Sequence, residues 1–180
     1  MNGDIHALIA EVANGDMVAF GKLYDSLTER VFNYARTITR SKEMAEDITQ
    51  DIFIQIYKHA KRIAKASNPV AYIMTATRNR SYNLLKRESR FIDVEDNAMD
   101  FGSTESPYEQ FVFKDAFNAL PINQRETVYL HLICGYSHKD VAAIQNAPLV
   151  TVKWRYGKAL SSLREYFSQD ESEGKCNEHI

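Results

Sequence analysis

The stretch SHKDVAAIQNAPLVTVKWRYGK, residues 137–158, decides the fold expected for this chain, because it predicts two short helices joined by a tight turn. Ser137 can cap the first helix in a capping box with Asp140. Asn146 tolerates the left-handed backbone that ends a helix, and Pro148 fits the start of the next one. Two helices in this order are typical of a helix-turn-helix that reads duplex DNA.

The second helix of this pair carries basic and base-reading side chains. Residues at helical spacing, which we expect to face the core, are Leu149, Val152, Tyr156, Ala159 or Leu160, and Leu163. The side chains left pointing outward are Val150, Thr151, Lys153, Trp154, Arg155 and Lys158. Positions 149–164 hold four bases and no acid, whereas a solvated helical hairpin, the alternative, usually carries both charges. Thr, Val, Arg and Lys all suit base edges in the major groove.

Charge is distributed unevenly along a chain whose net charge is only -2. Residues 58–90 hold nine bases and one acid, whereas 1–57 and 91–138 each hold an excess of acids. The basic block also contains Tyr72 and Tyr82. Cations among aromatic rings suit an unpaired strand, because phosphates meet the cations while bases stack on the rings. The alternative is that the tyrosines are buried and the charges solvate a helix.

The chain is predicted to be all-α, with two small helical domains joined by an acidic flexible linker. Residues 91–107 collect Asp, Glu, Ser, Asn and Gly and end in proline, a composition that marks a linker. We therefore expect one domain at 1–90, a second at 108–168 and a disordered tail at 169–180. The expected helices cover roughly 4–14, 17–26, 28–39, 42–64, 69–89, 107–119, 122–134 and the final pair.

The sequence contains no pattern typical of catalysis or of a metal site. The best carboxylate cluster lies on one predicted helix and comprises Glu43, Glu46, Asp47 and Asp51. It lacks the Glu-x-x-His pairs of a di-iron bundle, and the chain has no Gly-rich phosphate loop or nucleophile elbow. We predict no enzyme activity, no cofactor and no metal.

The helix with these carboxylates is also strongly amphipathic. Its apolar residues are Ile48, Ile52, Phe53, Ile56 and Tyr57. Carboxylates around an apolar stripe suit a protein partner with a basic groove.

The compartment predicted from the sequence is the cytoplasm. The chain has no apolar run as long as a membrane span, and its first residues carry acids where a secretory signal has bases. Cys134 and Cys176 show neither CxxC nor Cys/His spacing, so we expect no disulfide framework.

Three blocks of sequence, in order, carry a resemblance to a known family. They are AEDITQDIFIQIYKH (45–59), NPVAYIMTATRNRSYNLLKR (68–87) and ALPINQRETVYLHLICGYSHKDVAAIQNAPLVTVKWR (119–155). They resemble the region 2.2 helix, the region 2.3 to 2.4 helix and region 4 of bacterial RNA polymerase sigma factors of the extracytoplasmic-function (ECF) type, in the sigma-70 family. The resemblance runs from about Asp16 to Phe167.

The resemblance implies three functional surfaces. An acidic helix would dock on the clamp helices of the largest subunit of core RNA polymerase through Glu46, Asp47, Gln50, Asp51, Phe53, Ile54 and Tyr57. The basic helix and the loop before it would capture the non-template strand of the minus-10 element through Lys61, Arg62, Lys65, Tyr72, Arg78, Asn79, Arg80, Asn83 and Lys86. The helix-turn-helix, His138 to Gly157, would read the minus-35 duplex through Val150, Thr151, Lys153, Trp154, Arg155 and Lys158. The flap of the second subunit and an anti-sigma factor are further candidate partners.

The sequence therefore predicts a transcription initiation factor that binds core polymerase and helps to open a two-part promoter. Two alternatives come from other classes. A helix-turn-helix regulator would bind duplex DNA without polymerase, and an all-helical adaptor would bind no DNA. Residues 45–87 argue against the first, and the acid-free helix argues against the second. Departures from the family pattern are Tyr72, Asn83, Gln145, Asn146, Pro148 and Trp154.

Overall fold

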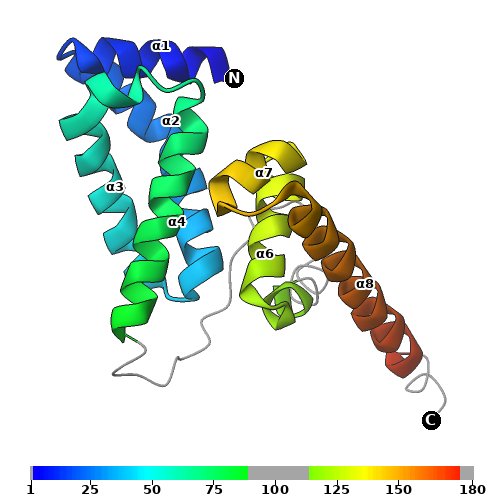
Figure 1. The fold of residues 1–180 in the computed structure, drawn as a ribbon. Coiled ribbons are helices and arrows are strands. Elements are labelled where there is room, and N and C mark those ends of the chain that lie inside the picture. Colours follow the sequence, from blue (N-terminus) through cyan, green and yellow to red (C-terminus); the bar gives the residue numbers. More distant parts are fainter. Residues whose placement is uncertain (1, 89–113, 175–180) are drawn as a thin grey trace.

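The protein consists of two packed helical bundles, seen in a computed structural model that describes residues 2–88 and 114–174 (Figure 1). The first bundle contains α1 (Asn2–Ala13), α2 (Met17–Thr39), α3 (Lys42–Ile63) and α4 (Pro69–Glu88). The second contains α6 (Ile122–Val128), η1 (Tyr129–Ile133), α7 (His138–Gln145) and α8 (Leu149–Gly174), preceded by helical residues at 114–119. The all-α prediction is confirmed for these ranges. The predicted linker, 91–107, lies outside them.

In the first bundle α1 lies across one end of α2, α3 and α4 (Figure 1). α2 begins at Asp16, whose carboxylate accepts from the backbone N–H groups of Val18 and Ala19 at 2.8 and 3.0 Å. The predicted break between residues 26 and 28 is wrong, because α2 is one helix. Leu27 is fully buried and continues the apolar face of that helix, so packing favours an unbroken helix at this point.

The starts of α3 and α4 are both set by side-chain caps. Ser41 caps the start of α3, as expected, by accepting from the N–H of Met44. α3 is kinked at His59, where φ is -118° and ψ is 17°. Asn68 caps α4 by accepting from the N–H of Ala71 at 3.0 Å. The Asn68 cap fixes the end of the short loop that precedes α4.

The helix-turn-helix prediction is confirmed in α7 and α8. Ser137 and Asp140 form the expected capping box, and Asn146 adopts the left-handed conformation at φ 49°. The predicted helix at 122–134 divides into α6 and a π-helical turn, η1, which ends before Gly135 at φ 72°. α8 continues to Gly174, six residues beyond the predicted domain boundary at 168, and 175–180 lie outside the described residues.

The two bundles share one hydrophobic core, because α6 and α7 pack against α2 and α4 (Figure 1). Tyr34 of α2 stacks on Tyr129 of η1 with ring centroids 5.8 Å apart. Arg125 of α6 donates from Nε to the carbonyl oxygen of Thr37 at 2.7 Å. The described part of the chain therefore forms a closed arrangement, with α8 running away from the first bundle. No helix in the described ranges could cross a membrane.

Replacing Ser137 by Ala is expected to lower the free energy of unfolding by about 1 kcal/mol, because α7 loses the acceptor of its capping box. Urea unfolding followed by circular dichroism measures the change. Ser161→Ala is the control, since that exposed hydroxyl donates only to its own helix at Gly157. Equal stabilities of the two variants would contradict the role of the cap.

Candidate nucleic-acid interface

The first half of α8 presents a basic and apolar face to solvent. Val150 is 79% exposed and Trp154 is 62% exposed, and Lys153 and Lys158 are also exposed. Thr151 is partly buried. The residues expected to face the core are buried or partly buried, led by Val152, Ala159 and Leu163. Trp154, which departs from the family pattern, therefore points away from the core and is available for contact.

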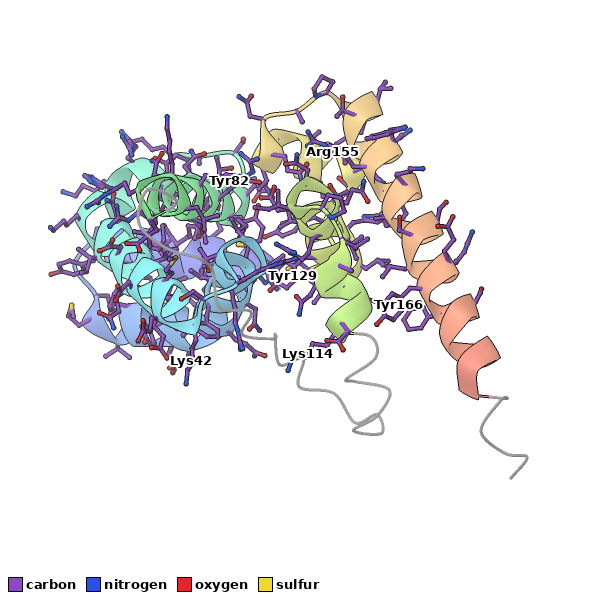
Figure 2. The ribbon with its side chains drawn as sticks, turned by 90° about the horizontal axis from the view of Figure 1, so that it is seen from below. Lys42, Tyr82, Lys114, Tyr129, Arg155 and Tyr166 are labelled. Atoms are coloured by element: carbon purple, nitrogen blue, oxygen red, sulfur yellow. The ribbon has the colours of Figure 1, made fainter. Side chains whose placement is uncertain are left out.

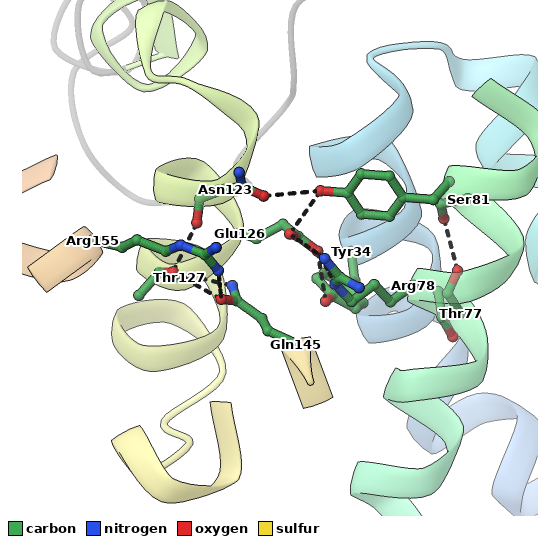
Figure 3. Close-up of polar contacts among 10 residues, drawn as sticks. Tyr34, Thr77, Arg78, Ser81, Asn123, Glu126, Thr127, Gln145 and Arg155 are labelled. Carbon is green, nitrogen blue, oxygen red and sulfur yellow. Dashed lines mark hydrogen bonds and ion pairs between the residues drawn. The ribbon is translucent and has the colours of Figure 1, made fainter. Parts of the chain in front are cut away.

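The guanidinium of Arg155 is the end of a chain of hydrogen bonds that runs through Gln145 to Thr127 (Figure 3). Its Nη1 donates to Oε1 of Gln145 at 2.9 Å, and Nε2 of Gln145 donates to the hydroxyl of Thr127 at 3.0 Å. Gln145 is only 3% exposed, so these bonds satisfy an amide that would otherwise be costly to bury. The structure thus accounts for Gln145, one of the departures from the family pattern. The bond to Gln145 uses one of the five guanidinium donors of Arg155.

Two histidines, His131 of η1 and His138 of α7, pack against Tyr156 of α8. The rings of His131 and His138 have centroids 4.0 Å apart, and both meet the ring of Tyr156 edge-on. Nδ1 of His131 lies 2.6 Å from the carbonyl oxygen of Tyr136. Burial lowers the pKa of His138, and the charges of His131 and Lys153 lower it further. Among the described residues no group of three potential ligands could hold a metal ion.

A second basic surface surrounds the loop between α3 and α4. Lys61, Arg62 and Lys65 are exposed there. The guanidinium of Arg62 donates to the hydroxyl of Tyr72 and lies 5.6 Å from the centre of its ring. Tyr72 is 36% exposed, so the alternative of a buried tyrosine is wrong at this position. A small pocket beside this pair is lined by residues that include His59, Arg62, Tyr72 and Ala76.

The basic surface continues along α4, but two of its predicted arginines are paired with acids. Asn79, Asn83 and Lys86 are exposed. Arg80 donates from Nε to Asp51 at 2.8 Å and so joins α4 to α3. Arg78 donates from Nε to Glu126 at 3.0 Å and so joins α4 to α6. The side chain of Arg78 is only 18% exposed, whereas that of Arg80 remains 42% exposed beside Asp51, so only Arg78 is largely withdrawn from solvent.

Glu126 is the centre of a polar cluster buried between the bundles (Figure 3). Besides Arg78, the hydroxyl of Tyr34 donates to its Oε1 at 3.0 Å and the hydroxyl of Tyr82 donates to its Oε2 at 2.9 Å. Arg78 also lies over the ring of Tyr82, 4.5 Å from its centre. Burial raises the pKa of the Glu126 carboxyl, although Arg78 and the two hydroxyls lower it. Burial also raises the pKa of both tyrosines, so their hydroxyls remain protonated donors.

The acidic face predicted on α3 is present, with one correction. Glu46, Asp47 and Gln50 are exposed, and Ile54 and Tyr57 are 50% and 52% exposed. Phe53 is 3% exposed, so the prediction that it contacts a partner is wrong in this conformation. Its ring packs against Tyr24 and Phe20 with centroids 4.5 and 6.4 Å away. Asp51 accepts from Arg80 but its side chain remains 41% exposed, so its contact with a partner stays a prediction.

The start of α2 carries three exposed apolar residues that we did not predict from the sequence. Met17 is 58% exposed, Val18 is 70% exposed and Tyr24 is 43% exposed, all on the first turns of α2. Figure 2 shows the side chains of the molecule around these helices. The ring contact between Tyr24 and Phe53 brings α2 beside α3 here, and no local sequence signal indicated this neighbour.

Comparison with known families matches each bundle to one region of the sigma-70 proteins. The sigma-70 region 2 family matches residues 23–91, and the sigma-70 region 4 family matches residues 111–163. ECF RNA polymerase sigma factor SigK of Mycobacterium bovis (strain BCG / Pasteur 1173P2) is 26% identical over 177 residues, which cover 91% of this chain and 94% of the relative. SigK of Mycobacterium sp. (strain JLS) is 25% identical over 173 residues, covering 89% of each chain. The chain belongs to the ECF-type sigma factors of the sigma-70 family.

Solved structures agree with this assignment. The sigma factor RpoE in complex with the anti-sigma factor NepR, from Bartonella quintana, has a TM-score of 0.73 and 26% identity, covering 83% of this sigma factor and 96% of that chain. CnrH, in complex with the cytosolic domain of CnrY, shares the fold at a TM-score of 0.67 and 21% identity, covering 93% of this sigma factor and 99% of that chain. The sigma factor therefore directs RNA polymerase to promoters for transcription initiation, and the regulator and adaptor alternatives are rejected.

Replacing Gln145 by Ala is expected to destabilise this sigma factor by about 1–3 kcal/mol, because the buried hydroxyl of Thr127 and the guanidinium of Arg155 lose their partner. Urea unfolding measures the difference. Gln55→Ala, at an exposed glutamine of α3, should change stability by less than about 0.5 kcal/mol. If Gln145→Ala were as stable as this control, the hydrogen-bonded chain would have no structural role.

Proposed function

We propose that this sigma factor divides promoter recognition between its bundles. Residues 1–90 bind core polymerase and open the minus-10 element, residues 108–168 read the minus-35 duplex, and 91–107 link the two. The observation that carries the proposal is that three exposed surfaces of different chemistry lie on the segments matched to regions 2 and 4. They are an acidic and apolar face on α3, a basic surface around Tyr72, and the acid-free face of α8.

The α3 face is proposed to dock on the clamp helices of the polymerase largest subunit. The carboxylates of Glu46 and Asp47 would steer a basic partner, while burial of Ile54 and Tyr57 would supply affinity. Phe53 acts from behind the surface, where it supports the exposed aromatic rings, whereas the partly exposed Asp51 fixes α4 against α3 and remains accessible to the partner. This division agrees with their burial and bonding.

The basic surface is proposed to hold the non-template strand of the minus-10 element. Lys61 and Lys65 would meet phosphates, and a base turned out of the stack would enter the pocket beside Tyr72 and Arg62. Unstacking costs a few kcal/mol per base, and stacking on an aromatic ring returns about 1–3 kcal/mol. Asn79, Asn83 and Lys86 would extend the contact along α4. Such binding energy opens DNA without ATP.

The helix-turn-helix is proposed to place α8 in the major groove of the minus-35 element. Val150, Thr151 and Trp154 offer apolar contacts to thymine methyl groups, and Lys153 offers a donor to guanine. Arg155 would approach the bases in an orientation limited by Gln145. Lys158, one turn further along, would meet a phosphate.

Further partners follow from the same role. The flap of the second polymerase subunit is a proposed contact of the second bundle. RpoE, which shares 26% identity, was solved with the anti-sigma factor NepR, and we propose that an anti-sigma factor also binds this chain. We further propose that the protein works in the cytoplasm, where it meets polymerase, and that it has no catalytic activity of its own.

Reversing two charges on the α3 face tests the docking proposal and the function together. Purified Glu46→Lys/Asp47→Lys protein should bind core polymerase about tenfold more weakly, because like charges now face the clamp helices. Transcription from a promoter library should fall in parallel. The matched double reversal Glu11→Lys/Glu165→Lys, at exposed acids elsewhere, should leave both unchanged. Normal assembly of the first variant would exclude this docking face, and absence of defined RNA start sites with the unaltered chain would exclude the proposed function.

Two substitutions on α8 separate base contacts from phosphate contacts. In the holoenzyme, Trp154→Ala should alter sequence preference within the minus-35 element, since it removes an apolar contact. Lys158→Ala should weaken binding to all sequences alike and lower the slope of affinity against salt by about one unit. Binding to a library of promoter duplexes at several salt concentrations distinguishes the two effects. A uniform loss for Trp154→Ala would remove Trp154 from the reading set.

A further inference from the structure

The most deeply buried charge in the described residues lies between the two bundles. Glu126 of α6 has no exposed surface, and its side-chain bonds run to the first bundle. One donor, Tyr34, belongs to α2, and the other two, Arg78 and Tyr82, belong to α4. Burying a carboxylate is costly unless strong donors compensate, so this cluster stabilises one particular placement of α6 on α2 and α4.

Other contacts hold the same joint at a second point. Arg125, the neighbour of Glu126, donates to the carbonyl oxygen of Thr37 at the end of α2, and Arg40 donates to the carbonyl oxygen of Asn118. The hydroxyl of Tyr129 lies 3.4 Å from the carbonyl oxygen of Arg30. These contacts follow α2 along its second half. The interface is therefore specific, with polar groups matched across it.

The closed arrangement is incompatible with simultaneous reading of both promoter elements. The minus-10 and minus-35 elements are named for positions about 25 base pairs apart, which is roughly 85 Å of duplex at about 3.4 Å per step. In the structure α7, the first helix of the helix-turn-helix, packs directly against α4 (Figure 1). Moreover, the side chain of Arg78 is only 18% exposed, since it bonds Glu126. The bundles must separate before α4 and α8 can occupy their sites together.

We propose that Glu126 is the centre of an intramolecular latch, formed with Tyr34, Arg78 and Tyr82, that keeps the free sigma factor closed and masks a strand-binding arginine. This inference rests on the proposed function, because it assigns Arg78 to the minus-10 strand. Opening exchanges Glu126 for a DNA phosphate as the anionic partner of Arg78. Carboxylate and phosphate suit the same guanidinium, so one anion substitutes for the other.

The latch lowers the apparent affinity of the free protein for single strands. Only the open fraction can bind, so the apparent dissociation constant equals the intrinsic one divided by that fraction. Weakening the latch therefore raises affinity without adding any contact to DNA. A purely structural role for Glu126 predicts unchanged or lower affinity for single strands, because a less stable protein gains no affinity.

The test uses the full-length protein with one substitution on each side of the joint. Glu126→Gln keeps the shape of the side chain but removes its charge, and Tyr34→Phe removes a single hydroxyl that reaches Glu126. Tyr166→Phe, at a partly exposed tyrosine of α8, is the control for the hydroxyl deletion, and Glu165→Gln is the control for the charge. Circular dichroism verifies that helix content is retained in each protein.

Two measurements decide the proposal. Small-angle X-ray scattering should give a larger radius of gyration for Glu126→Gln and Tyr34→Phe than for the unaltered chain and the controls. Both latch variants should also bind a single-stranded oligonucleotide of minus-10 sequence, or a single-stranded DNA pool, about five- to tenfold more tightly as the open fraction grows.

Three results would overturn the latch. They are an extended unaltered chain, latch variants as compact as the controls, or opened variants with unchanged affinity for the single strand. If Glu126→Gln loses helix content and Tyr34→Phe keeps it, the two measurements on Tyr34→Phe alone decide whether the latch exists. Holoenzyme transcription is measured separately, so a failure of the proposed function appears there while the scattering data still judge the latch.

Discussion

A buried carboxylate, Glu126, lies at the centre of the polar contact between the two bundles of this sigma factor. Glu126 carries its charge where water does not reach, and the donors that compensate it come from two helices of the other bundle. The cluster therefore specifies the orientation of one bundle on the other, whereas apolar contact alone, such as the stacking of Tyr34 on Tyr129, has less directional character. The same constraint covers the side chain of Arg78, which we propose to contact the promoter.

A second principle is that the proposed contact surfaces are supported by neighbouring side chains that are bonded or packed within the protein. Gln145 holds Arg155, Phe53 supports the exposed rings beside α3, and Asp51 fixes α4 through Arg80. Each supporting residue is partly or fully buried and bonded or packed. Substituting a supporting residue therefore changes the geometry of a neighbouring surface as well as the stability of the fold.

Sequence reasoning succeeded where signals are local and failed where partners are distant. The helix-turn-helix followed from Ser137 and Asn146, whose effects act within one helical turn. The pairing of Arg78 with Glu126 joins positions 48 residues apart, and that of Tyr34 with Glu126 joins positions 92 apart. Nothing near any of these residues indicates such a contact. The burial of Phe53 was missed for the same reason, since Tyr24 lies on another helix.

The accessibility of α8 has a consequence for the order of events at a promoter. Val150 and Trp154 are open to solvent in the same structure that covers Arg78. With the DNA-binding roles proposed above, a chain in this state would meet intact duplex through α8 while Arg78 is withheld from separated strands. In this proposal scanning of the genome is thereby uncoupled from unwinding, so that melting away from a gene start is avoided.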